Sequence, residues 1–102
     1  MSKINYQATL LDPRSLEPIE VNPKNGKSFK LAELYTLLDC DTIEVIPLDG
    51  TLILIVDEEG KFKKAPVLNM AASQMWYKCF PQMRGQDVIV GKALLCHTRQ
   101  LH

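Results

Sequence analysis

Three segments in the first half of the chain alternate between apolar and polar residues, a period of two that predicts β-strands. The first, residues 4–13, has apolar residues at alternate positions from Ile4 onwards and ends at an Asp-Pro turn signal. The second, residues 19–21, lies between prolines, which suits the edge of a sheet because proline donates no ladder hydrogen bond. The third, residues 42–48, should bury the face that carries Val45.

A continuous apolar run marks a different kind of strand. Asp49 and Gly50 form a strong hairpin signal, and residues 51–58 ("TLILIVDE") follow without alternation. Such a run predicts a central strand that is covered on both faces. Residues 87–97 predict the last strand, with Gly91 in its middle as a bulge or a point of close approach.

Two segments carry apolar residues at helical spacing instead. The first helix is predicted after Ser28, which suits the N-cap position. Its apolar stripe consists of Leu31, Leu34, Tyr35 and Leu38. The second helix is predicted over residues 68–80 and should end at Pro81. Its apolar stripe consists of Leu68, Ala71, Ala72, Met75, Trp76 and Cys79. Between the turn "EEGK" and this helix, residues 61–66 predict a short strand or an extended loop.

These elements predict an α+β fold: a mostly antiparallel sheet of five or six strands with two helices packed on it. A chain of 102 residues is expected to form a single globular domain over residues 1–102, because two domains would each be too small to hold a core. We expect residues 97–102 to form a flexible tail.

Composition narrows the classes of function. Hydrophobic residues make up 46% of the chain and charged residues 24%, which argues against disorder. A formal net charge of zero removes the usual electrostatic reason to expect nucleic acid or a membrane surface as a partner. The chain has no apolar run of membrane-spanning length and an odd number of cysteines, three. We therefore expect a soluble cytoplasmic protein with buried free thiols.

Two clusters of potential metal ligands are better explained without a metal. Residues 57–60 ("DEEG") could bind a hard cation, but the ligands of a calcium loop are spread over about twelve residues, so a solvated turn is favoured. Cys96, His97 and His102 could bind a transition metal only if the chain end folds back. Both histidines lie in the last six residues, which disfavours a nucleophilic enzyme. No catalytic residue, metal or cofactor is predicted.

The segment that leads into the second helix predicts a candidate ligand site. Lys61, Lys63 and Lys64 precede Asn69, which is placed to begin the helix. A helix N-terminus carries unpaired N–H groups and partial positive charge, so lysines beside it could bind a phosphate or another anion. The alternative is that Asn69 is a plain N-cap and the lysines are a solvated face.

Two aromatic residues on the second helix predict an interface. Trp76 and Tyr77 are adjacent, so their side chains point about 100° apart around the helix. Trp76 falls on the predicted apolar stripe, and Tyr77 should lie at its margin, where aromatic residues often contact partners.

The chain resembles a family of small domains of unknown function that bacteriophages, plasmids and other mobile elements encode. The resemblance runs from "ATLLDP" at residues 8–13 to "GKALLC" at residues 91–96, and its pieces recur in order. They are the strand at residues 43–48, the turn at 57–61, Asn69 with Ala71 and Ala72, and residues 87–95. The segment "NPKNGKSF" at residues 22–29 and the end "HTRQLH" depart from the family's shorter form. The resemblance implies a context, because accessory proteins of mobile elements often neutralise something that belongs to the host.

Three functions of different class follow. The first is a non-enzymatic protein of a mobile element that binds and neutralises a host protein, such as a defence component, through exposed aromatic residues and the charged hairpin. The second is a homo-oligomer that sequesters an anionic small molecule or nucleotide near the second helix. The third, an enzyme, is the least favoured. An apolar content of 46% in so small a domain also favours self-association.

Overall fold

The computed structural model describes residues 7–15, 17–63 and 65–101. Within these residues, five strands form one antiparallel sheet in the order β2-β1-β5-β4-β3. The strands are β1 (Ala8–Leu11), β2 (Ile19–Val21), β3 (Ile43–Pro47), β4 (Leu52–Asp57) and β5 (Ala93–His97). The fold is therefore α+β, as the sequence predicts, and β2 and β3 are the two edges of the sheet. Ile4 and Tyr6 of the predicted first strand lie outside the described residues.

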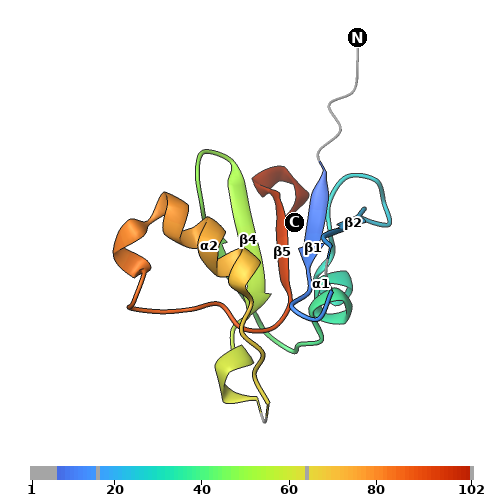
Figure 1. The fold of residues 1–102 in the computed structure, drawn as a ribbon. Helices are drawn as coiled ribbons and strands as arrows, with labels where there is room; N and C mark the ends of the chain where they lie inside the picture. Colours follow the sequence, from blue (N-terminus) through green and yellow to red (C-terminus); the bar gives the residue numbers. More distant parts are fainter. Residues whose placement is uncertain (1–6, 16, 64, 102) are drawn as a thin grey trace.

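The two helices of the described segments pack on opposite faces of this sheet. Helix α1 (Leu31–Leu38) and helix α2 (Met70–Cys79) each contribute buried side chains to a different core. Figure 1 shows α2 over β4, and α1 on the side of β1 and β2. Three short 3-10 helices also occur in the described chain: η1 (Gly60–Phe62), η2 (Pro81–Met83) and η3 (Thr98–Gln100). The sheet is thus the middle of three layers.

Each face of the sheet carries its own hydrophobic core. The core on the α1 side consists of Ala8, Leu10, Phe29, Leu34, Leu38, Cys40, Ile53, Ile55, Leu94 and Cys96. The core on the α2 side consists of Leu11, Ile46, Leu54, Val56, Ala72, Ile89 and Ala93. Alternate residues of β4 belong to different cores, because successive side chains of a strand point to opposite faces. The prediction of an interior strand covered on both faces is confirmed.

The hairpin and β3 differ from the prediction in detail. Asp49 and Gly50 do lie in the turn between β3 and β4, where Gly50 has a φ of +57°. In β3, however, the buried residue is Ile46, and Val45 is 38% exposed. On the predicted face, Ile43 packs against the core on the α1 side, but this core does not extend to Val45, so the prediction holds only for Ile43.

Helix α1 begins at Leu31, with Lys30 rather than Ser28 at the N-cap position. The reason is a tertiary contact: the N–H of Phe29 donates to the carbonyl of Gln100 at 2.6 Å, and Phe29 is fully buried. Phe29 is also paired with Leu101 in an isolated bridge, so this residue is held outside the helix. The carboxylate of Glu33 accepts hydrogen bonds from the Lys24 and Lys30 amides, and these bonds lower its pKa.

Two segments near α2 differ in part from their predictions. Of residues 61–66, where we expected a short strand or an extended loop, 61 and 62 belong to η1, and the described residues after them have no regular secondary structure. The last strand begins at Ala93 rather than at residue 87, because Gly91 has a φ of +75° and breaks the extended chain. Before this break, Val90 pairs with Leu68 in an isolated bridge. Residues 87–90 therefore pack beside α2 instead of extending the sheet.

The described end of the chain is packed against the body. His97 is the last residue of β5, and the Gln100 side chain accepts a hydrogen bond from the His97 amide at 3.0 Å. Gln100 is only 2% exposed, and Leu101 bridges to Phe29. These contacts hold residues 97–101 in the segment where we expected a flexible tail. Among the described residues, no helix is long and apolar enough to cross a membrane.

Candidate functional site

The lysines predicted to bind an anion are paired with carboxylates. Lys61 forms an ion pair with Asp87, which lowers the pKa of that carboxyl group. Lys63 Nζ lies 2.8 Å from Asp57 Oδ2, and this hydrogen bond raises the lysine's pKa. Lys63 also donates to the backbone carbonyl of Asp39 at the end of α1. Lys64 lies outside the described residues. The two described lysines thus tie η1 to neighbouring segments.

Asn69 is a structural residue at the beginning of α2. Its Oδ1 accepts from the Ala72 amide at 3.1 Å, which is the N-cap bond of the helix. Its Nδ2 donates to the carbonyls of Leu11 at 2.9 Å and Gly91 at 2.8 Å. At 1% exposure, the side chain has these three partners and little access to a ligand. The N-cap role that the alternative gives to Asn69 is confirmed, whereas Lys61 and Lys63 form ion pairs instead of a simple solvated face.

The cavity beside this helix end does not include Lys61 or Lys63. It has a volume of about 230 Å³ and is lined in part by Asn69 and Met70 from α2. Asp12 and Glu17 supply its charged groups. Carboxylates at this position disfavour an anionic ligand, so the structure does not bring the predicted lysines and Asn69 together at one open site.

Of the two aromatic residues on α2, Tyr77 lies deeper than the sequence predicts, whereas Trp76 packs against the core on the α2 side, as its place on the apolar stripe predicts. Tyr77 is only 7% exposed, whereas Trp76 is half-buried. The reason is that α2 packs on residues 87–90 as well as on the sheet. Tyr77 Oη donates to the Asp87 carbonyl at 2.5 Å, and Ser73 Oγ accepts from the Ile89 amide at 2.9 Å.

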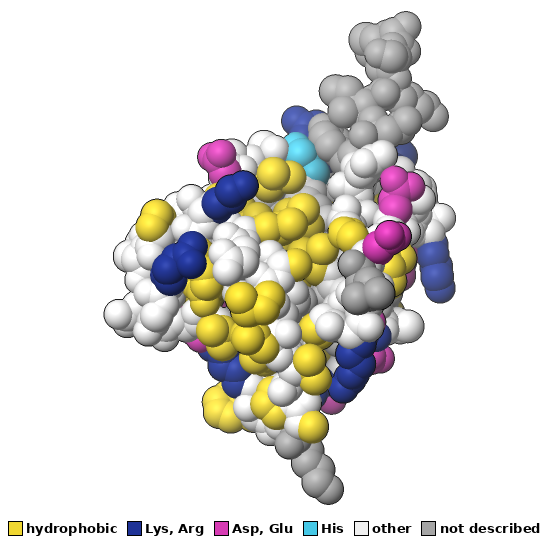
Figure 2. Space-filling view, viewed as in Figure 1, with side chains coloured by type: hydrophobic (Ala, Val, Ile, Leu, Met, Phe, Trp, Pro, Cys, Tyr) yellow, Lys and Arg dark blue, Asp and Glu magenta, His cyan; other side chains and the backbone are white. Residues whose placement is uncertain are grey.

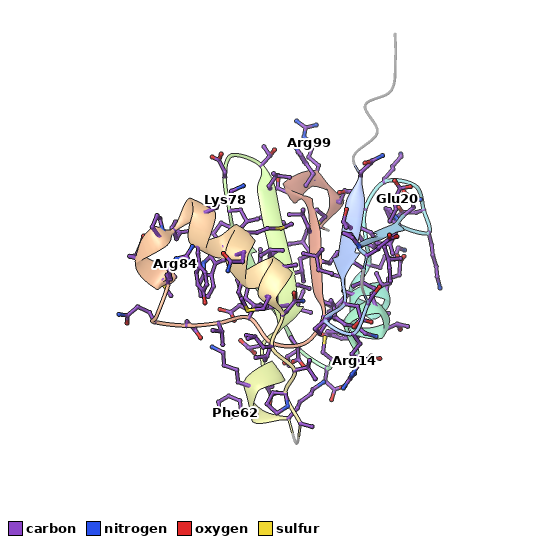
Figure 3. The ribbon with its side chains drawn as sticks, in the orientation of Figure 1. Arg14, Glu20, Phe62, Lys78, Arg84 and Arg99 are labelled. Atoms are coloured by element: carbon purple, nitrogen blue, oxygen red, sulfur yellow. The ribbon has the colours of Figure 1, made fainter. Side chains whose placement is uncertain are left out.

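Tyr77 nevertheless stacks on the ring of Trp76, which does reach the surface. The rings of Trp76 and Tyr77 are stacked, with centroids 6.3 Å apart and planes 20° apart. The guanidinium of Arg84 lies 5.2 Å from the centre of the Tyr77 ring, a distance at which a cation is attracted to an aromatic face. Figure 3 shows Arg84 beside the end of α2 that also carries Lys78. The stacked Tyr77 ring therefore restricts the orientation of the Trp76 ring.

Trp76 lies at the centre of a groove between α2 and the edge strand β3. One part of the groove has a volume of about 280 Å³. Its lining comes from three elements, namely β3 (Glu44, Val45, Ile46 and Pro47), the end of α2 with the residue after it (Trp76 and Phe80), and η2 (Gln82 and Met83). We call this surface the β3 groove. Figure 2 shows apolar side chains gathered on the α2 side of the molecule, with lysine and arginine side chains toward its margin.

A second cavity of about 220 Å³ continues the β3 groove toward η1 and shares Glu44, Ile46 and Trp76 with it. Glu58 and Phe62 also line this part, and Phe62 is 87% exposed. Phe62 points away from the body at the η1 end of the molecule (Figure 3). Within the described chain, the carboxylates of Glu44 and Glu58 have no ion-pair partner. The extended groove is therefore apolar at one end and acidic at the other.

The described segments hold no cluster of metal ligands, and two of their thiols are buried. No group of three or more His, Cys, Asp or Glu side chains among these residues could hold a metal ion. Burial raises the pKa of Cys96 to about 12, so this thiol is inert at neutral pH. Burial also raises the pKa of Cys40, and the described cysteines are free thiols. His102 lies outside the described residues.

The β3 groove was not predicted from the sequence, although one of its residues was. Trp76 and Tyr77 were both expected at an interface, Trp76 on the apolar stripe of the helix and Tyr77 at the margin of that stripe. Phe80 and Met83 follow the helix, where the pattern indicates only an end at Pro81. Pro47 within a strand was the available signal, because a proline inside a strand indicates a sheet edge.

A comparison with known protein families identifies the family of this chain. A family model described as "Domain of unknown function (DUF3846)" matches residues 6–100, which is nearly the whole sequence, so the chain belongs to this family. No curated protein and no solved structure matches the chain. The family assignment agrees with the resemblance to a family of domains of unknown function.

Proposed function

We propose that this DUF3846 protein is a non-enzymatic accessory protein of a bacteriophage or another mobile element, and that it binds and neutralises a protein in the cytoplasm of the host cell. The observation that supports this proposal is the β3 groove. A half-buried tryptophan at its centre is the kind of residue on which protein interfaces concentrate binding energy.

The chemistry of the groove fits a protein partner better than a small anion. Phe80 and Met83 surround Trp76 with apolar and polarisable surface, and Gln82 adds an exposed polar rim. The two carboxylates without ion-pair partners, Glu44 and Glu58, would repel a nucleotide phosphate. Lys61 and Lys63 already have acidic partners, so sequestration of an anionic ligand has less support.

An affinity capture with matched surface variants tests the proposal. Met83→Glu places a charge in the groove at a partly exposed position, and Leu31→Glu places the same charge at an exposed position on α1, on the other side of the sheet. The tagged protein and both variants are incubated with host lysate, and the retained proteins are identified by mass spectrometry. The identified partner is then purified, and its own activity is measured with and without the protein.

We expect Met83→Glu, but not Leu31→Glu, to lose the partner, and we expect the wild-type protein to inhibit that partner. Equal retention by both variants, or a partner whose activity is unaffected, would contradict the proposal. Native mass spectrometry of freshly purified protein examines the alternative, because a multimer that retains a nucleotide-sized adduct would favour sequestration.

A further inference from the structure

Strand β3 is an edge whose outward backbone groups face the groove. The Glu58 amide donates to the Thr42 carbonyl and the Leu48 amide donates to the Leu52 carbonyl, so residues at even positions of this strand turn their backbone groups toward β4. Hydrogen-bonded pairs alternate along an antiparallel ladder. The N–H groups of Ile43 and Val45 therefore point away from the sheet, as does the carbonyl of Pro47.

The side chains beside this edge are arranged by the same alternation. Ile46 belongs to the core on the α2 side, so Glu44, two positions away, projects from the same face as Ile46. A strand added to β3 would place every second side chain on this face. One of these side chains would meet Trp76, Phe80 and Met83 at the Pro47 end, and another would lie near Glu44 and Glu58.

We propose that the partner protein binds through an extended segment that adds to the outer edge of β3, which pairs with no other strand among the described residues. The segment places an apolar side chain in the β3 groove and a lysine or arginine two residues away, opposite Glu44. This inference rests on the proposed function, because it specifies how the neutralised protein is recognised. Backbone hydrogen bonds supply part of the affinity in such strand addition, and pockets for alternate side chains supply the specificity.

Two features of β3 define the segment further. Pro47 has no N–H group, so pairing is centred on Val45 and extends over about five residues. Strand neighbours on one face are about 7 Å apart, which matches an apolar and a basic side chain at positions i and i+2. The order of the two along the partner depends on whether its strand runs parallel or antiparallel to β3.

The acidic end of the groove is the reason to choose a basic partner over a second copy of this chain. In an antiparallel pair of two β3 strands centred on Val45, Glu44 of each copy would lie opposite Ile46 of the other. The two Glu44 carboxylates would then be diagonal neighbours on one face, within the range at which like charges repel. A basic segment replaces this repulsion with attraction.

Selection from a displayed library of random nine-residue peptides tests this inference before the partner itself has been identified. The wild-type protein is the bait, and amide hydrogen exchange of the wild-type protein is then measured with the enriched peptide bound. We expect enriched peptides to carry an apolar and a basic residue at i and i+2, and the amides of Ile43 and Val45 to become protected. Failure to enrich any peptide, enrichment of another pattern, or unchanged exchange at Val45 would overturn the inference.

A backbone variant separates strand addition from simple groove binding. Val45→Pro removes one outward N–H group from an edge position, and Val45→Thr keeps that group with a side chain of similar size. We expect Val45→Pro to weaken binding of the enriched peptide about tenfold relative to Val45→Thr, the effect of losing about one hydrogen bond. Glu44→Lys, at an exposed position, should weaken it as well. The exchange measurement on the wild-type protein decides the question if Val45→Pro does not fold.

The two proposals fail in different ways. If Met83→Glu abolishes capture of the host protein but Val45→Pro binds as Val45→Thr does, the groove is the docking site and strand addition is wrong. If neither change affects capture, the proposed function fails at this surface. A dimer in sedimentation analysis that Val45→Pro disrupts would identify a second copy as the occupant and overturn the choice of a basic partner segment.

Discussion

Replacement of Asn69 by alanine should be among the most destabilising single changes in this protein. The change removes the bond from Oδ1 to the Ala72 amide, and loss of an N-cap costs about 1 kcal/mol. It also removes the bonds from Nδ2 to the Leu11 and Gly91 carbonyls, where each buried group without a partner costs about 1–2 kcal/mol. Together these contributions predict a loss of about 3–5 kcal/mol, a large part of the stability of a small domain.

Urea unfolding followed by circular dichroism measures this loss. Asn25→Ala is the matched control, because Asn25 Oδ1 accepts from the Lys27 and Ser28 amides in an exposed turn and should contribute less than about 1 kcal/mol. Asn69→Asp keeps the cap acceptor but faces two carbonyl oxygens with a carboxylate, so at neutral pH it should be no more stable than Asn69→Ala. If Asn69→Ala loses no more than Asn25→Ala, Asn69 does not join α2 to the sheet, and a role in ligand binding becomes the better explanation.

Two further predictions concern buried groups. Ser73→Ala leaves the buried Ile89 amide without its acceptor and should lower the free energy of unfolding in urea by about 1–3 kcal/mol. The control Ser15→Ala, at an exposed position, should change the stability little. Equal effects of the two changes would contradict the role of Ser73. The pKa of Cys96 is raised from 9.0 to about 12 in the folded protein, so the unfolded thiol ionises first and stability should fall as pH rises above about 9. The free energy of unfolding of the wild-type protein should lose about 1.4 kcal/mol more than that of Cys96→Ala for each pH unit between 9 and 12, and parallel curves would refute this.

Local patterns predicted the fold because they report the interactions that form it. The apolar run of β4 identified a strand between two cores, since only burial on both faces makes every side chain apolar. The prolines beside residues 19–21 identified β2 as an edge strand. The beginning of α1 and the break at Gly91 were missed because both depend on partners distant in sequence: Phe29 meets Gln100, and Val90 meets Leu68.

The candidate site was less predictable for the same physical reason. Charge at Lys61 and Lys63 is visible in the sequence, but the carboxylates that pair with them come from β4 and from residue 87. The orientation of α2 could not be derived from its apolar stripe, because Ser73 and Tyr77 are buried by hydrogen bonds to residues 87–90 rather than by apolar packing alone. A helix that packs against a second segment as well as the sheet buries residues outside its apolar stripe.

The difference between the two edge strands, β2 and β3, supports β3 as the proposed binding surface. Edge strands are protected from pairing by short length, by proline and by charge. Strand β2 has only three residues and lies between Pro18 and Pro23, so it offers little to a partner strand. Strand β3 is longer, keeps outward N–H groups at Ile43 and Val45, and borders an apolar groove. In the proposed strand addition, Glu44 would leave this edge open but favour segments that bring a positive charge, and this would make the edge selective.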